Sequence, residues 1–218
     1  MYNWQKYNIK SNKLSLNFEK YNNVNFFNKI ENSYYNHTRD LFCLSLTKLK
    51  KKKNNICLDY GSNMMSISNI KNKIDAKRYK FFIYNPYLNK LRAKKLIGVK
   101  STELKDLKNF NHKIDFLNFG SSLQYIQEPF NIFEQFKFNK VSYILITATP
   151  FCINKNYQSK QKNHPGLDQN IIDFKKFNKF LNKINFRLIF KSSMNINNAS
   201  IKNLRKNTFF LNLLFEKN

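Results

Sequence analysis

The sequence contains few glycines, prolines, cysteines and acidic residues. Only 4 Gly and 4 Pro occur among 218 residues, which excludes collagen-like and linker-rich chains. Hydrophobic residues still make up 42% and aromatic residues 16% of the chain, which is enough to build a core and excludes global disorder. The length is that of one domain of ordinary size.

The three cysteines are Cys43, Cys57 and Cys152, each in an apolar stretch. Their odd number and the lack of a CxxC pair argue against a disulfide framework, so we expect reduced thiols and a cytoplasmic protein. Residues 1–6 contain no apolar run, and no stretch approaches the roughly 18 apolar residues of a membrane helix. We therefore expect neither a signal peptide nor a membrane span.

Acidic residues are outnumbered, 13 against 39 Lys and Arg, which gives a net charge of +26. Only 5 of these cations are Arg, the residue on which base-reading proteins rely most. The joint abundance of Lys, Asn, Ile, Phe and Tyr is typical of AT-biased coding, which explains the charge without a selected binding site. Non-specific attraction of nucleic acid still follows from the charge, and a basic RNA-binding or RNA-modifying α/β domain remains an alternative.

Four short apolar runs predict buried strands, each stopped by turn-forming residues. They are residues 56–60, 81–84, 114–119 and 143–146. Helix-length segments separate them, at residues 65–76, 87–96 and 129–138. Strands that alternate with helices predict an α/β chain with a parallel sheet.

The two ends of the chain differ from this alternation. Residues 1–36 predict an irregular N-terminal extension with one helix near 24–31, and a helix from Thr38 opens the domain that spans 37–218. A helix is expected over 173–184. The strands expected at 186–192 and 208–215 have no helix between them, so they should pair antiparallel at the sheet edge across a polar loop, 195–207.

Polar and small residues follow each predicted strand, at 59–63, 84–86, 118–122 and 147–150. The carboxyl ends of parallel strands share one edge, where open α/β sheets bind ligands. The pattern favours a nucleotide-like ligand. Phosphate-loop, dinucleotide and hydrolase-elbow motifs are lacking, and the three His are isolated, so we predict no metal site.

Residues 56–61 resemble the first motif of class I S-adenosylmethionine-dependent methyltransferases. Residues 119–129, 143–151 and 164–165 are similar to a bacterial methyltransferase family associated with surface-polysaccharide biosynthesis. The most specific part is the string Ser121-Ser122-Leu123-Gln124-Tyr125-Ile126. The similarity covers roughly residues 38–215.

This resemblance implies a Rossmann-like α/β fold with a seven-stranded, mostly parallel sheet of order 3-2-1-4-5-7-6. Its seventh strand is antiparallel, and helices cover both faces. It also implies S-adenosylmethionine as cofactor, lying over the first and fourth strand ends. The acceptor would be a small molecule or a glycan precursor.

The resemblance and the positions of residues near the strand ends together give candidate site residues. The cofactor-binding candidates are Asp59, Gly61, Asn63, Tyr84, Asn85, Phe119, Gly120, Ser121 and Ser122. The substrate-binding candidates are Gln124 and Thr149. The catalytic candidates are His164 and Asp168, both expected on the loop after the fifth strand as bases, and Tyr125 as a positioning hydroxyl. Plainer interpretations are a solvated loop residue for His164 and core packing for Tyr125.

The chain departs from the methyltransferase pattern in three places. Ser62 to Met65 replace glycines of the first motif, and Tyr84 or Asn85 stands where an acid usually binds the ribose. Thr147-Ala148 replaces an Asp-Arg pair of the family. A further alternative is therefore a degenerate methyltransferase that no longer binds cofactor.

Overall fold

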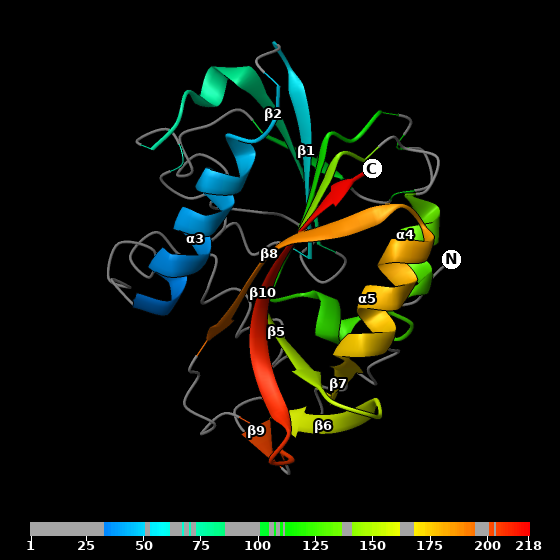
Figure 1. Ribbon diagram of the computed structural model, residues 1–218. Helices are drawn as coiled ribbons and strands as arrows, with labels where there is room; N and C mark the ends of the chain where they lie inside the picture. The colour runs from blue at the N-terminus through cyan, green and yellow to red at the C-terminus, as the bar shows by residue number, and fades with distance from the viewer. Residues whose placement is uncertain are drawn as a thin grey trace.

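The computed structural model describes residues 33–50, 53–61, 67, 70, 73–85, 101–104, 107, 110, 112–136, 141–161, 168–194, 201–202 and 204–218. The helices expected at 24–31 and 87–96, and most of the extension 1–36, lie outside these residues. One sheet stands between two helical layers, with α3 on one face and α4 and α5 on the other (Figure 1).

Five parallel strands form the centre of the sheet, in the order β3-β2-β1-β4-β5. They are β1 (Asn55–Tyr60), β2 (Tyr79–Tyr84), β3 (Ser101–Leu104), β4 (Phe116–Gly120) and β5 (Tyr143–Cys152). β1 and β4 are almost entirely buried, as expected for strands that are covered on both faces. The parallel sheet inferred from the apolar runs is confirmed, although β3 was not predicted.

Two antiparallel strands complete one side of the sheet. They are β8 (Phe186–Met194) and β10 (Thr208–Lys217), and β10 lies between β8 and β5. The predicted antiparallel pairing of the two C-terminal strands is confirmed.

The predicted count of seven strands is wrong, and the strand order differs in detail from the expected one. The additional strands include β6 (Tyr157–Gln161), β7 (Asp168–Asp173) and β9 (Ile201–Lys202). β5 does not end near residue 146 but continues to Cys152, and Phe151 pairs with Phe209 of β10 on one edge and with Ile172 of β7 on the other. β4 and β7 therefore pair with the same edge of β5, β4 along its first half and β7 at its carboxyl end.

The helices differ from prediction mainly at their ends. α3 (Ser33–Leu46) begins before Thr38, and α4 (Asn131–Gln135) is shorter than the expected 129–138. A 3-10 turn, η2 (Ala76–Arg78), stands at the end of the helix expected over 65–76. The helix expected over 173–184 is confirmed as α5 (Phe174–Lys183), capped by the Asp173 carboxylate, which accepts the Lys176 N–H at 3.1 Å.

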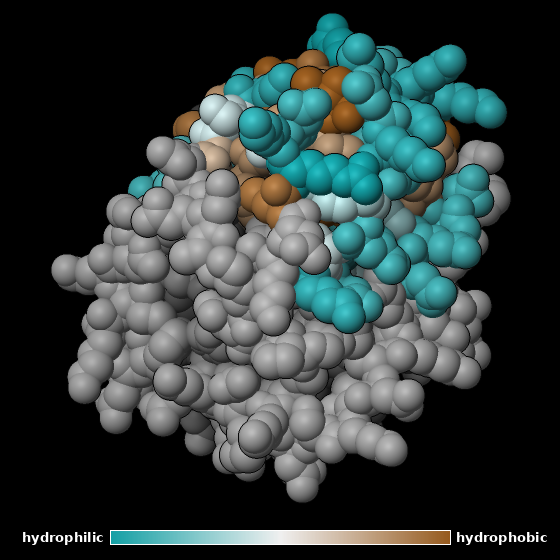
Figure 2. Space-filling model, turned by 90° about the horizontal axis from the view of Figure 1, so that it is seen from below, coloured by the Kyte–Doolittle hydropathy of each residue, from teal (hydrophilic) through white to brown (hydrophobic). Residues whose placement is uncertain are grey.

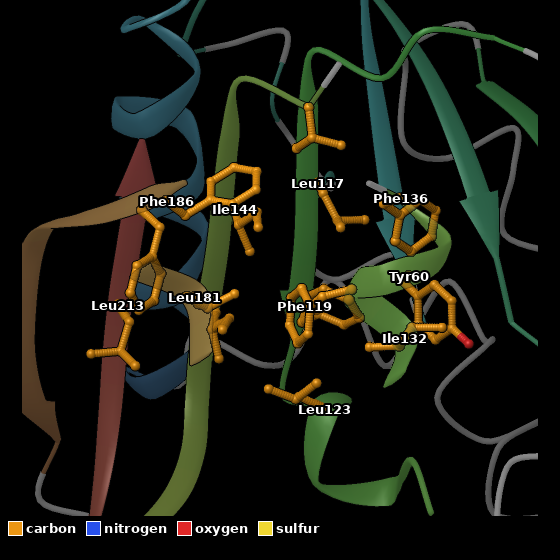
Figure 3. Close-up of a cluster of buried hydrophobic side chains, with 14 of the residues drawn as sticks. Tyr60, Leu117, Phe119, Leu123, Ile132, Phe136, Ile144, Leu181, Phe186 and Leu213 are labelled. Atoms are coloured by element: carbon orange, nitrogen blue, oxygen red, sulfur yellow. The ribbon is translucent and has the colours of Figure 1, made fainter. Parts of the chain in front are cut away.

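Two hydrophobic clusters fill the space on the two faces of the sheet. Neighbouring residues of a strand alternate between them, so that Cys57 faces α3 whereas Leu58 faces the opposite layer. Figure 3 shows part of the second cluster, where side chains of β1, β4 and β5 meet those of α4, α5 and β10. Within the described residues, no helix combines the length and apolar character that crossing a membrane requires.

Candidate cofactor and acceptor site

A buried polar pair lies between the two central strands. Asp59 of β1 stands opposite Asn118 of β4 in the parallel register, and both residues are 1% exposed. The Asn118 amide donates a hydrogen bond of 2.7 Å to the Asp59 carboxylate. Burying a carboxylate is costly unless hydrogen bonds or charges compensate it, so this pair fixes an acidic group close to the carboxyl end of β1.

Gly61 makes the turn that follows β1. Its φ is 72°, in the left-handed region where a Cβ would be unfavourable, and its N–H donates to the Tyr84 carbonyl at 2.6 Å. This bond brings the end of β1 against the end of β2, where Asn85 is buried and Tyr84 is half-buried. Four predicted cofactor residues therefore share one edge, whereas Asn63 lies outside the described residues.

The end of β4 is bonded to the end of β1. The Ser122 hydroxyl donates to the Tyr60 carbonyl at 2.6 Å, and Ser122 is 2% exposed. Ser121 has a left-handed φ of 56°, and its N–H donates to the Thr147 carbonyl of β5 at 3.0 Å. Phe119, Gly120, Ser121 and Ser122 thus lie together where β1 and β4 end, beside the middle of β5.

An aromatic layer lies beside this edge, on the α4 face of the sheet. The Tyr60 ring is 5.1 Å from Tyr84, 5.2 Å from Phe119 and 6.3 Å from Phe136, centroid to centroid. Figure 3 shows Tyr60, Phe119 and Phe136 grouped near α4. Phe119 is fully buried in this layer, so its side chain supports the site from within the core rather than lining it.

The two predicted substrate residues contact each other. Gln124 lies in the short 3-10 turn η4 (Leu123–Tyr125), and its amide nitrogen donates to the Ser121 hydroxyl at 3.1 Å. The Thr149 hydroxyl of β5 lies 3.4 Å from the Gln124 amide oxygen. Both side chains are buried, so this polar link connects β5 to the segment that follows β4.

A β-bulge marks the same part of β5. The register between β5 and β10 shifts near Ala148, which has a left-handed φ of 51°. The Asn212 side-chain oxygen accepts the Ala148 N–H at 2.9 Å, and Asn212 is completely buried. Bulges of this kind re-aim side chains next to active sites. Here the bulge lies between Thr147 and Thr149, beside the end of β4.

The predicted catalytic residues are only partly placed. His164 lies outside the described residues. Asp168 was expected on a loop, but it is the first residue of β7. The stretch interpreted as loop contains β6 and β7, which pair antiparallel. Tyr125 is half-buried in η4, and the next residue, Ile126, accepts a 2.6 Å hydrogen bond from the Asn170 amide of β7. Tyr125 and Asp168 therefore lie on neighbouring segments.

The cysteines have the environment of structural thiols. Burial raises the pKa of Cys43 to about 11, and burial together with Asp115 and Asp59 raises the pKa of Cys57 well above its usual value. The pKa of Cys152 is also raised, again mainly by burial. Since the thiolate is the nucleophilic form, none of the three is suited to nucleophilic catalysis.

Sequence reasoning missed the residues that hold the site together. Asn118 and Asn212 were not predicted as functional, yet each is the single polar residue of an apolar run, 116–119 and 209–215, and each bonds the site or its bulge. That interruption of an apolar run was the available signal, because a polar side chain is buried in a strand only with a partner.

Comparison with known proteins connects this geometry to one fold. No protein-family model matches the chain, and no curated protein matches its sequence. Solved structures do match. Magnesium protoporphyrin IX methyltransferase from Synechocystis PCC 6803, with bound S-adenosylhomocysteine, is similar with a TM-score of 0.64 and 11% identity over 95% of each chain.

Two further structures have the same fold. One is 1,6-didemethyltoxoflavin-N1-methyltransferase from Burkholderia thailandensis, with TM-score 0.57, 8% identity, and coverage of 94% of this chain and 87% of that one. The other is an S-adenosylmethionine-dependent methyltransferase from Clostridium acetobutylicum, with TM-score 0.57, 12% identity, and coverage of 94% and 99%. The chain therefore has the Rossmann-like α/β fold of these methyltransferases.

Proposed function

We propose that this protein is an S-adenosylmethionine-dependent methyltransferase with a small-molecule acceptor. The observation that carries the proposal is the meeting of the β1 and β4 ends, where Asp59, Gly61 and Ser122 are bonded to neighbouring strands in a fold that binds this cofactor elsewhere. In its finer form the proposal names a glycan precursor in surface-polysaccharide biosynthesis, which the sequence resemblance supports.

The described residues fit the cofactor chemically. Asp59 supplies a fixed negative charge for a cationic amino acid group, and Gly61 allows close approach because it has no Cβ. Asn85 stands at the end of β2, and its amide can both donate to and accept from ribose hydroxyls. The bound cofactor would supply an electrophilic methyl group on a sulfonium.

With so good a leaving group, the protein mainly has to orient the acceptor and exclude water. Gln124 and Thr149 contact each other just beyond the end of β4, where they would help to position the acceptor. For an oxygen acceptor, Asp168 or His164 would take the proton, and Tyr125 would orient the reacting hydroxyl.

Isothermal titration calorimetry with S-adenosylhomocysteine tests the proposal. We expect binding with a dissociation constant in the tens-of-micromolar range or tighter. A folded protein that shows no binding at millimolar ligand would refute the enzyme. The remaining explanation would then be a degenerate methyltransferase that no longer binds cofactor. The glycine-poor first motif and the uncharged end of β2 already suggest this alternative.

A further inference from the structure

A small basic pocket lies at the carboxyl end of β5, beyond the site described above. Its volume is about 250 Å³, and it is lined by residues 152–155, Tyr157 and residues 205–207. Thr208 pairs with Cys152, so the turn before β10 stands directly at the end of β5. Thr149 is three residues back along the strand, about 10 Å away. The pocket therefore adjoins the proposed acceptor side.

Figure 2 shows the molecule from below, the end at which β6 and β9 lie in Figure 1. The described residues coloured in this view are mostly hydrophilic, with a few hydrophobic residues between them.

Three cations and no acidic residue line the pocket. Lys155, Arg205 and Lys206 are all exposed, and no carboxylate of the described residues forms an ion pair with any of them. Asp173 is near Cys152, but its side chain is 2% exposed and accepts the Lys176 N–H. Among the described residues, no carboxylate thus neutralises the positive charge of the pocket.

Arg205 is held in place before any ligand binds. Its guanidinium lies 4.3 Å from the centroid of the Tyr157 ring, and its backbone N–H donates to the Tyr157 hydroxyl at 3.1 Å. The same hydroxyl is bonded to the Thr208 hydroxyl, and the Thr208 N–H donates to the Arg205 carbonyl at 3.0 Å. The turn and the ring together hold the planar guanidinium of Arg205 at the wall of the pocket.

The guanidinium groups of the other described arginines are buried or already have polar partners. Arg39 is buried, and Arg187 pairs with Glu216 at 3.2 Å. Arg78 lies over the Tyr79 ring and donates to the Lys50 carbonyl. Arg205 instead keeps its donors available beside two lysines, an arrangement suited to a phosphate, whose oxygens match the guanidinium fork.

We propose that this pocket binds a phosphoryl or diphosphate group of the acceptor, which makes the acceptor a phosphorylated small molecule. The assignment of that ligand to the acceptor rests on the proposed methyltransferase function, whereas the anion site itself does not. The small volume fits one or two phosphoryl groups, and the candidate acceptor residue Thr149 lies about 10 Å back along the same strand.

Calorimetric titration of the full chain with inorganic pyrophosphate tests the pocket. The variant R205Q/K206Q should weaken binding about tenfold or more, because two charged contacts are lost. The control K175Q/K179Q removes the same charge from exposed positions on α5 and should leave affinity unchanged. K155Q changes the cation that lines the pocket from the segment between β5 and β6, and it should weaken binding severalfold. It replaces R205Q/K206Q as the test if that double variant has a lowered melting temperature.

Equal weakening by both double variants would overturn the proposal, because diffuse positive charge would then explain binding. A titration with a twelve-residue oligouridylate separates a second source of phosphate. Binding of the oligonucleotide that depends on Arg205 and Lys206, without pyrophosphate binding, would make this a polynucleotide surface and refute the small-molecule acceptor.

Titration with S-adenosylhomocysteine in parallel keeps the two proposals distinct. Pyrophosphate binding without S-adenosylhomocysteine binding would refute the methyltransferase and retain the anion pocket. The opposite result would retain the methyltransferase and eliminate the pocket.

Discussion

Asn118 donates its side-chain amide to the Asp59 carboxylate at 2.7 Å, across two neighbouring parallel strands and out of contact with solvent. The pair spans the two strand ends over which the cofactor is proposed to lie. Asn118 therefore acts as a positioning residue for Asp59, which fixes the direction of the carboxylate.

The variant Asp59→Asn should bind S-adenosylhomocysteine about ten- to a hundredfold more weakly. The change keeps the shape of the side chain but removes the charge, and a charged hydrogen bond contributes about 1.5–3 kcal/mol. Calorimetry measures the loss. Asp40→Asn, the same charge change at an exposed position of α3, is the matched control. Equal affinity of Asp59→Asn and wild type would remove Asp59 from the cofactor site.

The bulge in β5 should depend on Asn212. In Asn212→Leu the buried Ala148 N–H loses its 2.9 Å acceptor, and an unsatisfied buried donor costs about 1–3 kcal/mol. The free energy of unfolding from urea titration should fall by this amount. Asn182→Ala, at an exposed position of α5, should change it little. An unchanged urea midpoint for Asn212→Leu would show that the bulge persists without this bond.

The stability of the fold should depend on pH through Tyr143 and Glu216. The Tyr143 hydroxyl donates to the Glu216 carboxylate at 2.7 Å, which lowers the pKa of Glu216, with Arg187 adding to the effect. Burial, followed by this bond, raises the pKa of Tyr143 to about 12. The carboxylate thus stabilises the fold above its ordinary pKa of 4.5, and this contribution is lost as the pH falls through its lowered value.

Tyr143 acts at the opposite end of the pH range. Its neutral form is favoured in the folded state, so its contribution is present below the ordinary pKa of 10.0 and is lost as the pH rises towards 12. The variant Tyr143→Phe should show a flatter profile of urea midpoint against pH at both the acid and the alkaline end. Glu134→Gln, at an exposed position of α4, should leave the acid limb as in wild type. A Tyr143→Phe profile parallel to that of wild type would contradict this coupling.

All three thiols should react slowly with a disulfide reagent at pH 8 in the native protein. Each is buried, with a raised pKa, so little thiolate is present or accessible. In urea all three should react together. Leu44→Cys, on a helix position that is 65% exposed, supplies the fast-reacting reference. Native reaction of any of the three natural thiols at the reference rate would show that its side chain is accessible.

The sequence predicted the central sheet well because its strands are continuous apolar runs ended by turns. The run around Leu58 and the run around Leu117 are buried on both faces, so their composition alone identifies them. The comparisons also show the Rossmann-like methyltransferase fold that the motif at the end of β1 suggested.

The missed strands lacked this signal. β3 has one buried residue among four, Ser101, and β6 is largely polar, so neither reads as an apolar run. β7 was interpreted as loop because its first half, from Asp168, is polar, and its pairing depends on the distant end of β5. Such partners are fixed by tertiary contacts, which local composition does not reveal.

The same contrast, between signals in the local sequence and contacts between distant segments, holds for the site residues. The shared position of Asp59, Gly61 and Ser122 was predictable because residues that follow parallel strands lie at one edge of the sheet. The bulge at Ala148 and its support by Asn212 join segments 64 residues apart, and no local pattern indicates that contact.

The attachment of β7 to the rest of the sheet has a consequence for how this protein diversifies. The β7–β6–β9 unit joins the central sheet through two residue pairs with β5, Phe151 with Ile172 and Cys152 with Asp173. Because, within the described residues, only these two pairs link it to a central strand, sequence changes within the unit would disturb little of the pairing among β1, β2, β4 and β5. Under the proposed function, recognition of the acceptor can therefore change while the ends of β1 and β4 stay constant.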